Sequence, residues 1–148
     1  MHRAKDVAKW FLAHNREIME AEDSEYISNL KLQKLLYYAQ GTFLAVTDHA
    51  LFADPIVAWK HGPVVESVYH EYSSNGAKGI VFDEGFDPST FTPEENDLLT
   101  QVYDVFGQYS AWKLRDMTHQ ETPWQTTEQS AVISNDKIRD YFKQEYIE

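Results

Sequence analysis

One short stretch of the sequence holds side chains that could bind a metal ion. His61 precedes a Gly-Pro step, and Glu66 and His70 follow at a spacing of four, which places them on one face if this segment is helical. Imidazole nitrogens and carboxylate oxygens are zinc ligands, so the three residues are a candidate metal site. The H-E-x-x-H spacing of a zinc protease is absent, however, and solvated side chains on a helix surface account for the same letters.

A second stretch, T-H-Q-E-T-P-W at 118–124, could transfer protons. His119 and Glu121 lie close together in the sequence, and a histidine with a carboxylate can act as an acid–base pair. Side chains two positions apart rarely reach the same point, and a histidine at the end of a helix often interacts with free backbone carbonyls. We therefore expect His119 to satisfy backbone groups and Trp124 to pack into the core.

The loops that bind nucleotides or carry a catalytic serine are absent from the sequence. It contains no G-x-x-x-x-G-K-[ST], G-x-G-x-x-G or G-x-S-x-G. The absence of cysteine excludes disulfides, thiolate catalysis and cysteine-based zinc sites. We expect neither a cofactor nor a metal ion. A small hydrolase or transferase that uses His61, His70 or His119 with a nearby Glu is kept as an alternative.

The charge of the chain is strongly negative. Its 148 residues include 24 acidic and 13 basic side chains, for a net charge of −11. This charge repels nucleic-acid phosphates and anionic membranes, and it attracts a basic partner. The first ten residues lack the apolar core of a signal peptide, and no apolar run approaches the roughly 18 residues of a membrane span. We expect a cytoplasmic protein that binds neither nucleic acid nor membrane directly.

Apolar residues recur at spacings of three and four over most of the chain, which predicts a mainly helical fold in one compact domain, 1–148. We expect Ser28 or Asn29, Ser110 and Ser134 to cap helices, and Thr92 with Glu95 to form a capping box. The expected helices cover 4–21, 29–46, 93–106, 111–119, a turn near 122–124, and the residues after 134. The second of these is the most apolar and should form the centre of the core.

Two short segments rich in β-branched or aromatic residues predict a minor sheet beside the helices. These segments are 56–59 and 80–82, and if they pair they form a small hairpin-like sheet. Between them, Gly62 permits a turn. Pro63 is suited to the first position of a helix, where its missing N–H costs nothing.

Three segments together resemble one family. They are L-K-L-Q-K-L-L-Y-Y-A-Q (30–40), I-V-A-W-K-H-G-P-V-V-E-S-V-Y (56–69) and L-R-D-M-T-H-Q-E-T-P-W (114–124). In order and spacing they resemble the Panacea domain, the SocA-like antitoxin domain that also occurs in phage-associated proteins of the GepA type. The resemblance implies a mostly helical antitoxin that neutralises a toxin by direct protein contact, without catalysis. It also implies the alternative of an adaptor that delivers a client protein to a protease.

The motif residues divide into those that we expect to support the fold and those that we expect to contact a partner. The first group is Leu32, Gln33, Leu35, Trp59, Gly62, Pro63, Val64, Pro123 and Trp124. The second group is Lys34, Tyr37, Tyr38, Lys60, His61, Glu66, Tyr69, His70 and His119. The expected partner is a toxin encoded by an adjacent gene, whose basic surface would suit aromatic anchors set among acidic residues. A protease is the further partner in the adaptor alternative.

Overall fold

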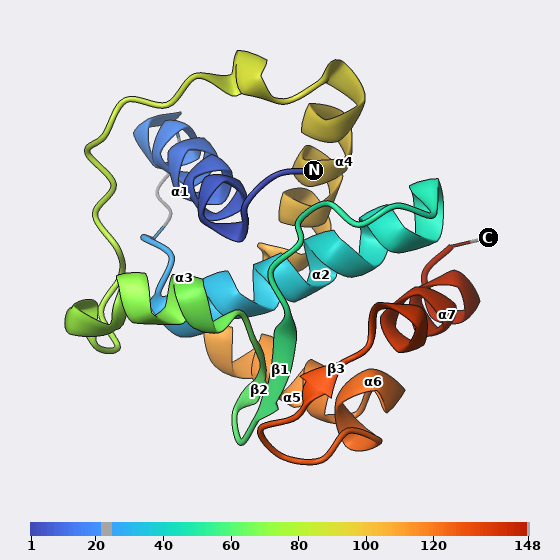
Figure 1. Cartoon of the computed structure of the whole chain (residues 1–148). Coiled ribbons are helices and arrows are strands. Elements are labelled where there is room, and N and C mark those ends of the chain that lie inside the picture. Colours follow the sequence, from blue (N-terminus) through green and yellow to red (C-terminus); the bar gives the residue numbers. More distant parts are fainter. Residues whose placement is uncertain (22–24, 148) are drawn as a thin grey trace.

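One helix, α2, runs through the centre of the fold, and the other elements are arranged around it (Figure 1). The computed structural model describes residues 1–21 and 25–147. Over these residues the elements are α1 (Ala4–Ala21), α2 (Asn29–Thr47), β1 (Ile56–Trp59), β2 (Gly62–Val64), α3 (Glu66–Glu71), η1 (Ser73–Asn75), η2 (Pro88–Thr90), α4 (Pro93–Phe106), α5 (Ala111–His119), α6 (Thr122–Gln125), β3 (Val132–Ile133) and α7 (Asn135–Glu145). The mainly helical fold with a minor sheet, expected from the sequence, is confirmed.

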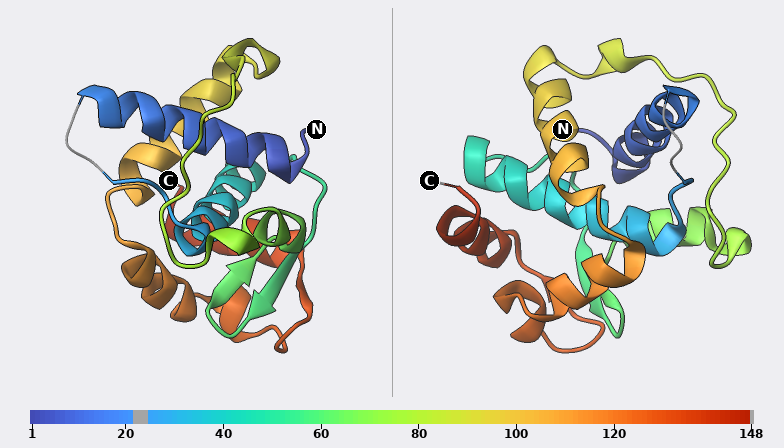
Figure 2. Two further views of the ribbon diagram at one scale, coloured as in Figure 1. Left: turned by 90° about the vertical axis from the view of Figure 1, so that its left-hand side faces the viewer. Right: turned by 180° about the vertical axis from the view of Figure 1, so that it is seen from behind.

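The middle of helix α2 is covered on all sides. Every residue from Leu32 to Gly41 is buried, whereas a helix at the surface of a protein keeps one polar face. Helices α1 and α4 lie on one side of α2, the β1–β2 hairpin and α5 lie on the other, and α7 packs against it (Figures 1 and 2). Within the described residues, no helix is long and apolar enough to cross a membrane.

The helices begin at the residues that the sequence indicates. Ser28, Ser110 and Ser134 each accept a hydrogen bond from the backbone N–H three positions further on. Thr92 and Glu95 form the reciprocal capping box at the start of α4. These contacts satisfy backbone donors that the first turn of a helix leaves free, so the helix starts are fixed locally.

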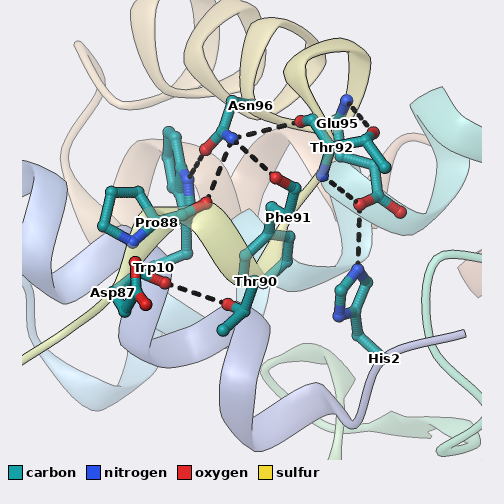
Figure 3. A network of polar contacts seen from close by, with 9 residues as sticks. All are labelled: His2, Trp10, Asp87, Pro88, Thr90, Phe91, Thr92, Glu95 and Asn96. Atoms are coloured by element: carbon teal, nitrogen blue, oxygen red, sulfur yellow. Dashed lines mark hydrogen bonds and ion pairs between the residues drawn. The ribbon is translucent and has the colours of Figure 1, made fainter.

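Helix α1 is tied to the start of α4 by a polar network (Figure 3). The Nε2 atom of His2 lies 3.0 Å from Oε1 of Glu95, which also accepts a hydrogen bond from the backbone of Thr92. The indole of Trp10 donates to Oδ1 of Asn96 at 2.8 Å, and the Asn96 amide donates to three backbone carbonyls. The network therefore joins residues that are 93 and 86 positions apart.

The expectation that Pro63 begins a helix is wrong. Gly62 and Pro63 lie in β2, which pairs antiparallel with β1 so that Trp59 is opposite Gly62. The φ angle of Gly62 is 110°, a conformation that glycine adopts without steric cost, and this closes the hairpin after only two residues. Strand β2 is at the edge of the sheet, where a proline is tolerated. Helix α3 begins only at Glu66.

The expectation of a second strand at 80–82 is also wrong. The side chains of Ile80 and Phe82 are buried, but the backbone of Ile80 makes a single bridging hydrogen bond to the carbonyl of Ile27. The third strand is β3, which pairs antiparallel with β1. Two residues are too few to show the alternation by which a strand is recognised, so the sequence did not predict β3.

Gly41 allows α7 to approach α2 closely. Three ring atoms of Phe142 lie 2.4–2.6 Å from the position that a Cβ atom on Gly41 would occupy. We predict that Gly41→Ala displaces this buried ring and lowers the free energy of unfolding by about 1–2 kcal/mol, although alanine favours the helix by about 1 kcal/mol. Urea denaturation followed by circular dichroism measures the change.

Gly85→Ala is the matched control for this substitution, because no heavy atom lies within 4 Å of its Cβ position. We expect it to change stability by less than about 0.5 kcal/mol. Adding Phe142→Leu to Gly41→Ala makes room for the new methyl group, so the double variant should lose less than the sum of the two single losses. A Gly41→Ala protein as stable as the wild type would contradict the packing argument.

Candidate partner-binding groove

A groove of about 740 Å³ opens beside the N-terminal end of α2. Its walls come from the start of α2, the β1–β2 hairpin, α3 and η1 with the loop that follows, the start of α5, and the loop before β3. The lining residues are Ser28, Asn29, Leu30, Gln33, Trp59, Lys60, His61, Val64, Tyr69, Ser73, Gly76, Ala77, Ala111, Trp112, Gln129 and Ser130. Segments that are far apart in the sequence thus enclose one concave surface.

Aromatic side chains form much of the groove wall. The rings of Trp59 and Tyr69 meet edge to face, with their centroids 4.9 Å apart. Trp112, in the first turn of α5, is 58% exposed. A large aromatic ring left in water next to a concave apolar surface is typical of a binding site for another molecule, because burying the ring there contributes much of the affinity.

A cluster of polar contacts joins α5 to the hairpin at this wall. The guanidinium of Arg115 lies over the ring of Trp112, 4.6 Å from its centroid. Its Nε–H donates to Nδ1 of His61 at 3.1 Å, and its Nη1 atom pairs with Asp116. Since Nδ1 of His61 accepts a hydrogen bond, the neutral ring carries its proton on Nε2. The cluster fixes both His61 and Trp112 relative to the groove.

The groove differs in charge from the protein as a whole. The sequence contains 24 acidic residues, yet no Asp or Glu occurs among the described residues that line the groove. The lining residues that can carry a positive charge are Lys60 and His61, both of them exposed. The net charge of −11 is therefore carried by other parts of the surface.

Polar side chains of α2 hold the hairpin in place from its buried side. The Nζ atom of Lys34 donates to the carbonyl of Pro63 at 3.0 Å, and Oε1 of Gln33 accepts from the backbone N–H of Val65. Burial, reinforced by the positive charge of Arg115, lowers the pKa of Lys34 to about 7. A buried amine without a carboxylate partner is easier to accommodate in its neutral form, which this lowered pKa allows at neutral pH.

A buried carboxylate organises a second polar cluster between α2, α6 and α7. Glu121, 3% exposed, accepts hydrogen bonds from the hydroxyl groups of Tyr37 and Tyr38 at 2.9 Å and of Tyr146 at 2.6 Å. Burial raises the pKa of the Glu121 carboxyl, and the three donors oppose that rise. Burial and the nearby carboxylate raise the pKa of all three tyrosines.

The expectation that Lys34, Tyr37 and Tyr38 contact a partner is corrected by their positions. All three side chains are 0% exposed, because α2 is covered on every side. Lysine and tyrosine carry polar tips and therefore suggest a surface position, but here the tips bond to Pro63 and Glu121 in the interior. These three residues support the fold.

The other residues expected to contact a partner lie at or near the surface, and they do not form one cluster. Lys60, His61 and Tyr69 line the groove. Glu66 and His70 are exposed on α3, and the ring of His70 is 6.4 Å from the ring of Trp59. His119 is stacked on Trp124, with 4.1 Å between the ring centroids. Within the described part of the chain, no group of three His, Asp or Glu residues is placed to hold a metal ion.

His119 has an unusual environment among these residues. Its Nε2 atom is buried and has no hydrogen-bond partner in the described part of the chain. Burial, followed by the positive charges of Arg115 and Lys34, lowers its pKa, so the ring is neutral at pH 7. The indole of Trp124, on which it stacks, donates to the carbonyl of Trp59 at 2.8 Å and thereby ties α6 to β1.

The other residues expected to support the fold lie in the core or along β2. Leu32, Leu35 and Gln33 are buried in α2, and Pro123 is buried in α6. Gly62, Pro63 and Val64 form β2. Gln33, Trp59 and Val64 also line the groove.

Sequence reasoning missed Trp112, the most exposed aromatic residue of the groove. A signal was present, however. Leu114 and Thr118 are the buried residues of α5, and Trp112 is two positions before Leu114, which places it on the opposite, solvent-facing side of the helix. A single exposed aromatic residue is common on protein surfaces, so Trp112 becomes informative only together with the groove that it lines.

Comparison with known proteins places the chain in a family. Residues 32–125 match the family described as Antitoxin SocA-like, Panacea domain, so the chain belongs to that family and the resemblance noted from the sequence is confirmed. The chain is also similar to Antitoxin SocA of Caulobacter vibrioides (strain NA1000 / CB15N), with 36% identity over 109 residues. That match covers 66% of this chain and 58% of the relative. No solved structure matches.

The buried amine of Lys34 makes stability depend on pH. Its pKa is about 7 in the folded protein and 10.5 ordinarily, so between these values the unfolded chain binds a proton that the folded chain lacks. Stability should therefore rise from pH 7 to pH 9, by up to about 1 kcal/mol per pH unit. We predict that Lys34→Met loses most of this rise, as measured by urea unfolding at pH 7, 8 and 9.

Lys113→Met, at an exposed position on α5, is the control and should keep the wild-type pH profile. Lys31, whose pKa burial also lowers, accounts for the small rise that Lys34→Met should retain. The raised pKa values of the three tyrosines around Glu121 reduce stability only above about pH 10, outside this range. A wild-type protein with equal stability at pH 7 and 9 would show that Lys34 is charged in the folded state.

Proposed function

We propose that this protein is an antitoxin that neutralises a toxin protein by binding it in the groove, without catalysis. Membership of the SocA-like family and the similarity to a protein named as an antitoxin support the class of function. The observation that carries the proposal is the apolar groove with the exposed ring of Trp112 at its wall. Most of the groove comes from segments within residues 32–125, which match the family.

The groove has the features from which protein interfaces gain affinity. Trp59, Tyr69 and Trp112 present aromatic surface within one concave area, and such residues are enriched among those that dominate binding energy. The contacts of Arg115 with Trp112 and His61 hold two of the groove residues in place before a partner arrives. Because fewer side-chain rotamers are then lost on binding, the entropic cost of association is reduced.

The positions of the histidines support a role without catalysis. His61 is bonded to Arg115 and His119 is stacked on Trp124, and in the described part of the chain neither forms an ion pair with a carboxylate. The His–carboxylate pair in the described part of the chain is His2 with Glu95, where it fastens α1 to α4 (Figure 3). The hydrolase or transferase alternative requires a histidine and a carboxylate at a site that can take a substrate, and this pairing serves the fold.

The proposal predicts that Trp112→Ala abolishes neutralisation while leaving the protein folded. Co-expression with the product of a toxic neighbouring gene should restore growth for the wild type and fail to do so for Trp112→Ala. With purified proteins, calorimetry should show a loss of affinity of about 30-fold or more, corresponding to about 2 kcal/mol. The circular dichroism spectrum should not change, because the ring is exposed.

Val105→Ala is the matched control, since Val105 is 50% exposed on α4 and does not line the groove. It should neutralise the toxin as the wild type does. Titration of toxin activity tests the mechanism, because binding reaches its end point at a fixed molar ratio. Neutralisation by trace amounts of this protein would contradict the proposal and favour an enzyme. Loss of the toxin from cells only when a protease is present would identify the adaptor alternative.

A further inference from the structure

The groove continues beyond the aromatic wall. A second hollow, of about 580 Å³, adjoins the first, and the two share Ser28, Ala77 and Ala111 as lining residues. Tyr26, 45% exposed, and Tyr109 line the second hollow. The residues that the two hollows share are small. An occupant that fills both hollows is extended, as a stretch of polypeptide is.

The two hollows differ in charge. Among the described lining residues of the first hollow, Lys60 and His61 are those that can carry a positive charge, and no carboxylate accompanies them. The second hollow includes Glu25 and Lys31, and the Lys31 amine is already bonded to the carbonyl of Gly107 at 2.6 Å. An anionic group on an occupant is therefore favoured at the Lys60 end.

Lys60 is available to bind such a group. It is exposed in the turn between β1 and β2, and its side chain makes no hydrogen bond or ion pair with any described residue. Its neighbour His61 directs Nδ1 toward Arg115, which leaves the Nε2–H free to donate. Two donors from one tight turn, with the guanidinium of Arg115 behind them, match the two oxygens of a carboxylate.

We propose that the occupant of the groove is an extended toxin segment that places a carboxylate at Lys60 and His61 and an apolar side chain against Trp59 and Tyr69. This inference rests on the proposed function and specifies the chemistry of the toxin surface. It separates two electrostatic effects. The net charge of −11 attracts a basic toxin at long range, whereas the groove selects a locally acidic and apolar segment of it.

A charge reversal in the groove tests the inference. We expect Lys60→Glu to weaken binding of the neighbouring-gene toxin by about 30-fold or more, since it replaces an attraction by a repulsion at a partly desolvated site. Lys113→Glu makes the same change in net charge on the exposed first turn of α5, and Lys113 does not line the groove. It should weaken binding by less than about threefold, because exposed charges are screened at 0.15 M salt.

The toxin residue that meets Lys60 can be found with overlapping synthetic peptides that cover the toxin sequence. The peptide that binds the wild type most tightly should contain an apolar residue beside an Asp, a Glu or the chain terminus. Replacing the side-chain carboxylate by its amide, or amidating the terminus, distinguishes the two sources of the carboxylate. Placing a lysine at this toxin position should restore binding to Lys60→Glu by at least about tenfold.

The outcomes separate this inference from the proposed function. If Trp112→Ala weakens toxin binding but Lys60→Glu binds as the wild type does, the carboxylate inference is overturned and the antitoxin proposal stands. If neither variant differs from the wild type, the groove is not the binding site and both are overturned. A concentration-dependent dimer that Lys60→Glu dissociates would show that a second copy of the chain fills the groove, which also overturns the inference.

Discussion

The burial of the middle of α2, from Leu32 to Gly41, is the constraint on which the rest of the structure depends. A helix that is covered on every side must satisfy its polar side chains within the protein, because water does not reach them. Gln33 and Lys34 do so by bonding the backbone of β2 and the residue after it, and Gln40 bonds the backbone of residues 51–52. The polar groups of the central helix therefore determine where the neighbouring loops and the hairpin lie.

The shape of the groove depends on these bonds between α2 and the hairpin. Trp59, Lys60 and His61 lie in or next to the turn of the hairpin and line the groove. Lys34 bonds the second strand of this hairpin, β2, from its buried side. The same short motif thus has two sides. One side meets the buried amine of α2, and the other presents an aromatic ring, an exposed amine and an imidazole to the groove. Residues that support the fold and residues that can bind are therefore interleaved within β1 and β2, and substitutions on the buried side are expected to disturb binding indirectly.

Local signals explain what could be predicted from the sequence. Capping residues such as Ser28 and Thr92 act on their own first turn, so helix starts were predicted correctly. The pairing of β3 with β1 joins residues that are far apart in the chain, and the roles of Tyr37 and Tyr38 depend on Glu121, which is more than 80 positions away. Spacing reveals which face of a helix a residue occupies, but not whether another helix covers that face. For the same reason, the motif at 56–64 was found while the cavity beside it was not.

The assembly of the groove from distant segments sets the order of events during synthesis. Its walls include Ser28 near one end of the chain and Ser130 near the other, and α1 is held by contacts with α4. A ribosome that has translated only the first hundred residues has made α2 and the hairpin, but neither the indole of Trp112 nor the strand that completes the sheet. The groove is therefore complete only once Ser130 has been synthesised. On the proposed function, a translation product that stops short of Ser130 therefore lacks the complete binding groove.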